Sequence, residues 1–184
     1  AINKLLYVLK KHDAPATFFI RTNNVHYNPN LLRAIAADGH EIGCHTDKHL
    51  QMTKYDVNTK NYISIVNRDE YLKDLQESYN KLEKIVGDVV VNGKYALTRF
   101  FRPPTLVISK TSLACVLESG FEYIIEGYST KDYTAESYLK VRYSIEDQLY
   151  TDDGTLRKGS IFVLHMGNSS AAISAEALDY KIGR

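Results

Sequence analysis

The sequence contains no tryptophan, only four prolines and only two cysteines in 184 residues. Cys44 and Cys115 are too few for a disulfide framework, and each lies in an apolar stretch where a buried thiol is the usual state. We therefore expect both thiols to be free. The 44% of hydrophobic residues supplies enough apolar surface for the core of a single domain.

The sequence also lacks a large excess of positive or negative charge. The sequence balances 23 basic against 22 acidic side chains, which leaves a formal charge of +1. This balance lacks the electrostatic footprint of a protein that binds nucleic acid or an anionic membrane. No apolar run approaches the roughly 20 residues that a membrane-spanning helix needs. We therefore expect neither a nucleic acid partner nor a membrane span in residues 1–184.

What the sequence does contain is an alternation of short apolar runs and amphipathic segments. Apolar runs typical of buried parallel strands occupy residues 16–20, 40–44, 99–102, 123–125 and 161–164. Helical periodicity predicts helices near residues 2–9, 29–38, 72–85, 113–119, 138–149 and 171–178. Residues 46–67 are expected to form a polar loop, and residues 89–93 a small strand and turn.

This alternation predicts an α/β fold with a parallel sheet, either open or closed into a barrel. In such folds the functional residues gather at the C-terminal ends of the strands. The polar residues that follow each predicted strand are therefore the candidates for a site.

Two histidines, His45 and His49, follow the second predicted strand within the segment Asp-Gly-His-Glu-Ile-Gly-Cys-His-Thr-Asp-Lys-His of residues 38–49. On a helical turn, positions four apart share a face with Cβ atoms roughly 5–6 Å apart, which lets two imidazoles bind one metal ion. Histidines at this spacing also occur by chance on a surface or in a core. The pair by itself therefore leaves both interpretations open.

Two more polar side chains stand where a predicted strand ends. Arg102 precedes Pro103 and Pro104, and a buried arginine there needs a carboxylate partner because an unpaired guanidinium is costly to bury. The alternative is a rigid loop with a surface ion pair. His165 follows the apolar run 161–164, where burial would suit it to acid–base chemistry, although a lone histidine there is more often a satisfied core residue.

Taken in order, these segments resemble the polysaccharide deacetylase family, which is carbohydrate esterase family four with its NodB-like domain. Residues 39–49 resemble the Gly-His-Glu-Ile-Gly and His-(Ser/Thr)-x-x-His motifs, and residues 102–104 resemble Arg-Pro-Pro-Tyr. Leu164 and His165 resemble the family's Leu-His motif, and residues 11–20 its Lys-x-x-x-x-Ala-Thr-Phe-Phe stretch. The motifs in this order are far more specific than any one of them.

The resemblance implies a distorted, incomplete (β/α) barrel with parallel strands and a divalent metal, usually zinc and sometimes cobalt or another ion. His45 and His49 correspond to the two histidine ligands, and Thr46 to a small hydroxyl residue that braces their loop. Asp47 should point away from both histidines on a helical turn, so it is not expected to be the third ligand.

In the family, the third ligand and the catalytic base come from a Thr-Phe-Asp-Asp segment that should lie just before residue 1. We therefore expect residues 1–184 to be a single catalytic domain that is truncated at both ends. It would lack the first strand, with the two aspartates, and the last strand.

The activity that the resemblance implies is the hydrolysis of N- or O-acetyl groups on a polysaccharide or oligosaccharide such as peptidoglycan, a chitin-like oligomer or xylan. By position, His165 would be the general acid and Arg102 would orient the base. The backbone N–H of Thr105 would contribute to the oxyanion site, and Leu164 would line the pocket for the acetyl methyl group. An extracellular or cell-envelope location follows from the resemblance alone.

Two positions depart from the family pattern. Thr105 replaces a tyrosine that often contacts substrate, so the choice of substrate is expected to be unusual. Ser129 stands at the first of two acidic positions, which leaves Asp132 as a weak substitute for the carboxylate that tunes the acid histidine. Tyr133 replaces a tryptophan and offers its ring to a sugar.

Three functions remain open from the sequence. An active metal-dependent deacetylase accounts for all the motifs in their order. A carbohydrate-binding relative with degenerate catalysis accounts for the departures at Thr105 and Ser129. An unrelated metal hydrolase with the same two histidines leaves the order of the Arg-Pro-Pro and Leu-His segments unexplained.

Overall fold

The computed structural model describes residues 2–167 and 170–182. The chain divides into two compact units. Residues 16–126 form the central unit, and the described parts of residues 1–15 and 127–184 form the terminal unit. Within the described ranges, no helix combines the length and apolar character needed to cross a membrane. The single domain expected over residues 1–184 stays a prediction.

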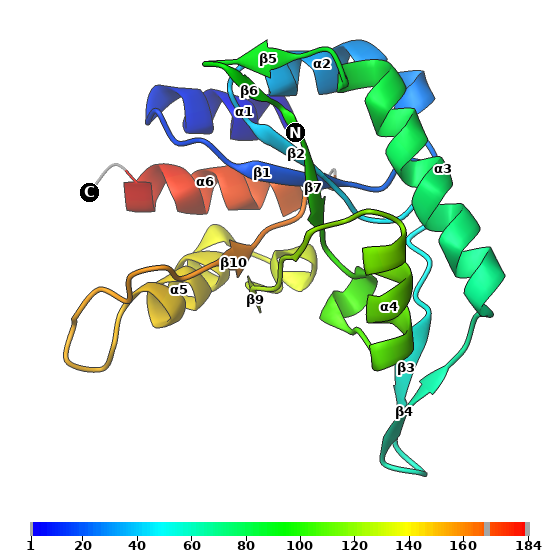
Figure 1. Cartoon of the computed structure of the whole chain (residues 1–184). Coiled ribbons are helices and arrows are strands. Elements are labelled where there is room, and N and C mark those ends of the chain that lie inside the picture. The colour runs from blue at the N-terminus through cyan, green and yellow to red at the C-terminus, as the bar shows by residue number, and fades with distance from the viewer. Residues whose placement is uncertain (1, 168–169, 183–184) are drawn as a thin grey trace. The chain divides into compact units, whose positions relative to one another are not determined.

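The central unit contains a four-stranded parallel sheet in the order β1-β2-β7-β8, and Figure 1 labels its strands β1, β2 and β7. Its strands are β1 (Thr17–Ile20), β2 (Glu41–Cys44), β7 (Leu97–Phe101) and β8 (Tyr123–Ile124). Ile42, Cys44 and Phe101 on the two middle strands are fully buried. Such burial is expected where helices and loops cover both faces of a parallel sheet.

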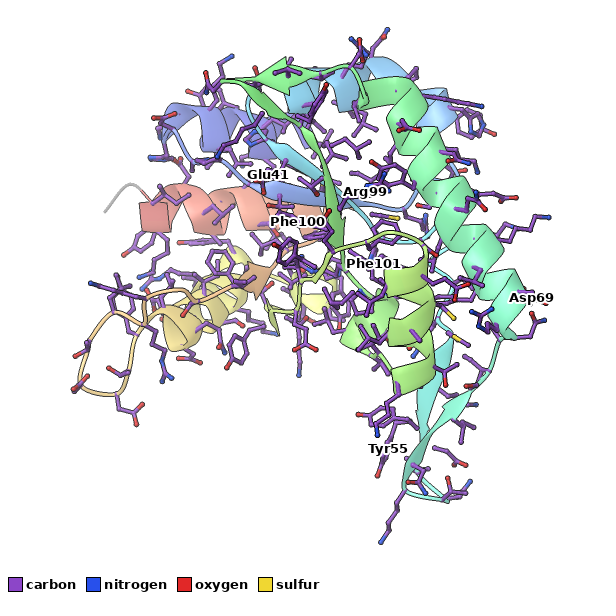
Figure 2. The ribbon with its side chains drawn as sticks, viewed as in Figure 1. Glu41, Tyr55, Asp69, Arg99, Phe100 and Phe101 are labelled. Atoms are coloured by element: carbon purple, nitrogen blue, oxygen red, sulfur yellow. The ribbon has the colours of Figure 1, made fainter. Side chains whose placement is uncertain are left out.

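The central unit also contains three α-helices and two 3₁₀ turns. They are α2 (Pro29–Ala37), α3 (Arg68–Val86), α4 (Lys110–Glu118), η1 (Val25–Tyr27) and η2 (Pro104–Leu106). Helix α3 begins after Asn67, whose side chain accepts the N–H of Glu70, and Asp69 and Glu70 occupy its first turn (Figure 2). An acceptor and acidic side chains at that end stabilise the unpaired N–H groups of the first turn. The helix contacts β2 and β7.

Residues 46–67 hold more structure than the predicted polar loop. They contain an antiparallel hairpin of β3 (Thr53–Asp56) and β4 (Asn61–Ser64), which extends beyond α4 (Figure 1). Tyr55, labelled in Figure 2, pairs with Tyr62 across the hairpin, and their ring centroids lie 5.3 Å apart. A second hairpin, β5 (Val90–Val91) and β6 (Lys94–Tyr95), turns at Asn92 and Gly93, as predicted for the strand and turn near residues 89–93.

The terminal unit is mostly helical. It contains α1 (Ile2–Lys11), η3 (Asp132–Thr134), α5 (Tyr138–Leu149) and α6 (Ser170–Ile182), with β9 (Tyr128–Ser129) and β10 (Phe162–Val163) as a short parallel pair. Helix α6 packs against both α1 and α5. Its alanines at 171, 175 and 177 are fully buried, and small side chains let neighbouring helices approach closely.

The observed elements confirm the predicted α/β class with parallel strands. All six predicted helices are present, and the five apolar runs each contain a parallel strand. The strands at β8 and β10 are shorter than the runs that predicted them, because only two residues of each join a ladder.

Candidate active site

Residues 45–49, here the histidine loop, follow β2 and carry His45 and His49. The centroids of the two rings lie 4.9 Å apart, and one ring presents its edge to the other. All five of these residues are described, and none belongs to a helix, so a helical turn is not what brings the two histidines together. Thr46 and His49 instead have φ angles of 63° and 60°, and these left-handed residues fold the loop so that the rings meet.

This backbone is strained. A residue other than glycine in the left-handed region costs on the order of 1–3 kcal/mol, and a β-branched threonine is especially disfavoured there. The strain persists only where surrounding contacts hold it, and several do. The Oγ1 of Thr46 accepts the N–H of Leu50 at 2.9 Å, and the carbonyl oxygen of Thr46 accepts the N–H of Thr22. Thr46 thus braces the loop, as its position in the motif implied.

The geometry of His45 determines which nitrogen carries the proton. Its Nδ1 lies 2.6 Å from the carbonyl oxygen of Arg102. A carbonyl oxygen only accepts hydrogen bonds, so Nδ1 is the donor and Nε2 carries the lone pair. Histidine ligands of metals are usually oriented by such a bond from the other ring nitrogen.

The two imidazoles fit a divalent metal such as zinc, which favours nitrogen ligands. Within residues 2–167 and 170–182, no group of three or more histidine, cysteine or acidic side chains is placed to hold a metal. The histidine loop therefore offers two candidate ligands, and their role in binding a metal stays a prediction.

The carboxylate of Asp47 is buried beside the loop. Its Oδ1 accepts a hydrogen bond from the hydroxyl of Thr22 at 2.7 Å and one from the ammonium of Lys81 at 2.6 Å. Burial raises the pKa of Asp47, but the bonds from Lys81 and Thr22 outweigh it and hold that pKa below its usual value. Its side chain is engaged with these two groups.

Arg102 lies half-buried beside the same loop, and among the described residues no carboxylate forms the ion pair that was predicted for it. Its Nε and Nη2 donate to the carbonyl oxygens of Ile125 and Glu126, each at 3.1 Å, and its guanidinium lies 4.2 Å from the ring centroid of Phe19. Two carbonyl dipoles and an aromatic face compensate the charge. Burial lowers the pKa of Arg102 to about 10, so the side chain stays charged at neutral pH.

Thr105 and Leu106 are two consecutive left-handed residues, with φ angles of 59° and 60°. Thr105 is exposed, and its hydroxyl donates to the carbonyl oxygen of Pro104 at 2.6 Å. The two left-handed conformations fix the directions of the N–H and C=O groups of Thr105 and Leu106. The use of the Thr105 N–H in an oxyanion site stays a prediction.

In the terminal unit, Asp132 holds His165 by two bonds. Its Oδ1 lies 2.7 Å from Nδ1 of the ring, and its Oδ2 accepts the backbone N–H of His165 at 2.6 Å. The hydroxyl of Ser174 donates to the same Oδ2 at 2.7 Å. Asp132 thus contacts the histidine directly, and its catalytic role stays a prediction.

Asp132 is ionised in this setting. Its residue is only 1% exposed, and burial raises its pKa, but the hydrogen bonds from His165 and Ser174 outweigh burial and bring the pKa below its usual value. A buried carboxylate with three donors is stable as an anion, and an anion accepts the Nδ1–H of the ring.

The burial predicted for His165 is wrong. Its side chain is 45% exposed, because β10 ends at Val163 and the chain leaves the ladder before reaching the histidine. Leu164 is half-buried. Tyr133 is 56% exposed, and its ring presents an edge to the imidazole of His165 at 4.9 Å between centroids. The substrate-binding roles of Leu164 and Tyr133 stay predictions.

The predicted residues thus fall into two groups. His45, His49, Arg102 and Thr105 lie in the central unit, and Asp132, Tyr133, Leu164 and His165 lie in the terminal unit. Sequence reasoning missed Asp74 on α3, whose carboxylate bonds to the histidine loop. The available signal was a polar row at positions 74, 78 and 81, on a helix face that is otherwise apolar.

Comparison with known proteins identifies the family to which the chain belongs. The family described as polysaccharide deacetylase matches residues 1–124. The chain belongs to the polysaccharide deacetylase family. It is 31% identical over 134 residues to a peptidoglycan-N-acetylglucosamine deacetylase of Bacillus cereus, across 73% of this chain and 42% of that protein. The chain spans about half the length of the curated relatives that it matches, with shares of 58%, 42% and 39%.

Solved structures agree on the fold. A crystal structure of a peptidoglycan N-acetylglucosamine deacetylase is similar with a TM-score of 0.75 and 26% identity, over 99% of this chain and 73% of that one. A family 4 acetyl xylan esterase from Clostridium thermocellum, solved with a cobalt ion, has a TM-score of 0.72 and 22% identity, over 98% and 75% of the two chains. These likenesses confirm the predicted fold class.

Proposed function

We propose that this chain carries the metal-binding histidines and the acid of an enzyme that removes acetyl groups from a polysaccharide. The observation that carries the proposal is the convergence of His45 and His49, with Nδ1 of His45 fixed on the carbonyl of Arg102. This arrangement presents imidazole nitrogens as ligands, and it occurs in a chain of the deacetylase family.

His45 and His49 would hold a divalent ion, with zinc the first choice and cobalt or another ion an alternative. Such an ion, when bound, polarises the acetyl carbonyl and acidifies a water molecule. The chain's own contribution is to orient the rings, through the bond from Nδ1 of His45 and the braced backbone of Thr46. The backbone N–H of Thr105 would stabilise the oxyanion, and Arg102 would orient the base.

His165 would act as the general acid. Protonated on both nitrogens, its ring keeps Nδ1–H on the ionised Asp132 and gives the Nε2 proton to the departing amine or alkoxide, which leaves acetate as the second product. The carboxylate of Asp132 accepts hydrogen bonds from the ring and from the backbone N–H of His165, and its negative charge stabilises the imidazolium. Exposure of the ring suits a group that must meet a polymer.

Peptidoglycan is the first substrate to test, because the relative and the structure of highest identity described above are named for deacetylating its N-acetylglucosamine. Chitin-like oligomers and acetylated xylan follow. Leu164 would line the pocket for the acetyl methyl group, and Tyr133 would present its ring to the sugar. A substrate of this kind places the protein outside the cell or in its envelope.

The decisive experiment measures zinc binding by calorimetry and acetate release from peptidoglycan, acetylated chito-oligosaccharides and acetylated xylan, with the full-length protein. Its variant carries His45→Ala and His49→Ala, and His26→Ala on η1 serves as a matched control because that side chain is exposed in the same unit. We expect the double variant to lose both metal binding and acetate release, and the control to keep both.

Failure of the wild-type protein to bind zinc or cobalt would overturn the proposal, as would a double variant that binds metal as tightly as the wild type. A wild-type protein that binds the glycans but neither binds metal nor releases acetate would be the carbohydrate-binding relative with degenerate catalysis.

A further inference from the structure

The N–H of His45 still bonds to the carbonyl oxygen of Ile20 on β1, but the rest of the histidine loop lies outside any helix or strand, so its backbone N–H groups need other partners. Two of them find a single side chain. Asp74 accepts the N–H of Asp47 at 2.7 Å with Oδ1 and the N–H of Lys48 at 3.2 Å with Oδ2. Both donors lie between the two histidines, so this carboxylate is bonded to the part of the backbone that connects the two rings.

Asp74 is well placed to fix that backbone. It is 5% exposed and lies on α3, 27 residues along the chain from Asp47. The helix is 19 residues long, begins with a side-chain cap at Asn67, and buries Leu75 and Leu82 completely. A carboxylate on such a helix is a rigid reference point, whereas the left-handed residues of the loop have no regular structure to hold them.

A second side chain on the same face of α3 adds to this contact. Lys81, seven positions after Asp74, donates to Oδ1 of Asp47 at 2.6 Å. Residues seven apart on a helix lie two turns apart on one face. The helix therefore contacts Asp47 twice, once at its backbone through Asp74 and once at its side chain through Lys81.

We propose that Asp74, assisted by Lys81, is a positioning residue that holds the histidine loop in the conformation where the rings of His45 and His49 converge. This inference rests on the proposed function of the two histidines as metal ligands. Asp74 touches neither ring in any contact described above, and it acts through the backbone between them. A carboxylate suits the task because both of its oxygens accept, whereas asparagine would turn an NH₂ group towards one of the two N–H donors.

The test compares Asp74→Asn with Glu77→Gln in the full-length protein. Glu77 is a matched control, because it undergoes the same change from carboxylate to amide on the same helix, and its side chain is 43% exposed. Cobalt affinity is measured by visible absorption, zinc affinity by calorimetry, and exchange of the Asp47 and Lys48 amide hydrogens by NMR without metal. We expect Asp74→Asn to weaken metal binding about 10- to 100-fold and to speed exchange of both amides, and Glu77→Gln to change neither.

The outcomes separate this inference from the proposed function. If the wild type binds metal through His45 and His49, and Asp74→Asn binds it equally tightly, the positioning role is overturned and the metal site stands. If the wild type binds no metal, the metal site fails, and the amide exchange decides whether Asp74 holds the loop. If Asp74→Asn does not fold, Lys81→Met replaces it, because that side chain is 40% exposed. Unchanged metal affinity and unchanged exchange in a folded Lys81→Met would then overturn the role.

Discussion

Asp132 and His165 are joined by two hydrogen bonds, one to the imidazole at 2.7 Å and one to the backbone N–H at 2.6 Å. One carboxylate therefore fixes both the position of the histidine backbone and the rotation of its ring. Because Asp132 is buried and ionised, its charge is available to stabilise the imidazolium form at close range.

Replacing Asp132 with asparagine should therefore reduce catalysis more than metal binding. The amide keeps the size of the side chain but loses the charge that supports the acid, so kcat for deacetylation should fall about 100- to 10,000-fold. Steady-state kinetics and zinc calorimetry on the full-length protein check this. Asp147→Asn, at an exposed position of the same unit, should leave kcat unchanged. A kcat for Asp132→Asn equal to that of the wild type would refute the role.

Arg102→Lys should be a destabilising change despite conserving the charge. An ammonium cannot reproduce the planar fork that reaches the carbonyls of Ile125 and Glu126 while stacking on Phe19. We expect a loss of about 1–3 kcal/mol in the free energy of unfolding, because buried acceptors are left unpaired. Urea denaturation measures it, and Arg21→Lys at an exposed position should stay within about 0.5 kcal/mol of the wild type. An equal loss of unfolding free energy in Arg102→Lys and Arg21→Lys would show that the contacts of the Arg102 guanidinium do not stabilise the fold.

Thr105→Gly should stabilise the protein. Thr105 has a φ of 59°, where glycine pays no steric cost, and the relief of strain should exceed the extra entropy of the unfolded chain by about 0.5–1 kcal/mol. Thr111→Gly, on the exposed face of α4, should lower the free energy of unfolding by a similar amount. Both values come from denaturant unfolding. Destabilisation by Thr105→Gly would show that its side chain contributes more than its backbone strain costs.

His40 should make stability depend on pH in the mildly acidic range. Burial lowers the pKa of His40, with a smaller opposite effect from Asp38, and its Nδ1 accepts the N–H of Ala16 in the neutral form. The unfolded chain then binds a proton at a higher pH than the folded chain does. Stability is therefore full above the unfolded value of about 6.5 and is lost as the pH falls through the folded pKa.

The measurement is the melting temperature between pH 7.5 and pH 5 for the wild type and for His40→Gln. The wild type should lose more stability over this range than the variant, whose side chain does not titrate. Parallel curves for the two proteins would show that protonation of His40 does not oppose folding.

Periodicity predicted every α-helix of the described chain, and apolar runs predicted every strand of the parallel ladders except β9. Both signals are local, since they record which side chains of one segment face the core. The hairpin of β3 and β4 was missed because its strands are mostly exposed, so residues 53–64 show little apolar alternation. The facing tyrosines 55 and 62 were the remaining signal.

The α/β class, the order of the motifs and the residue types suited to a metal site and an acid all follow from the amino-acid sequence alone. What each polar group contacts depends on the folding of distant segments. Arg102 binds the carbonyls of Ile125 and Glu126, Asp132 reaches His165 over 33 residues, and Asp74 reaches the histidine loop over 27. The physical reason is that burial makes every polar group need a partner, but only the packing of distant segments supplies one.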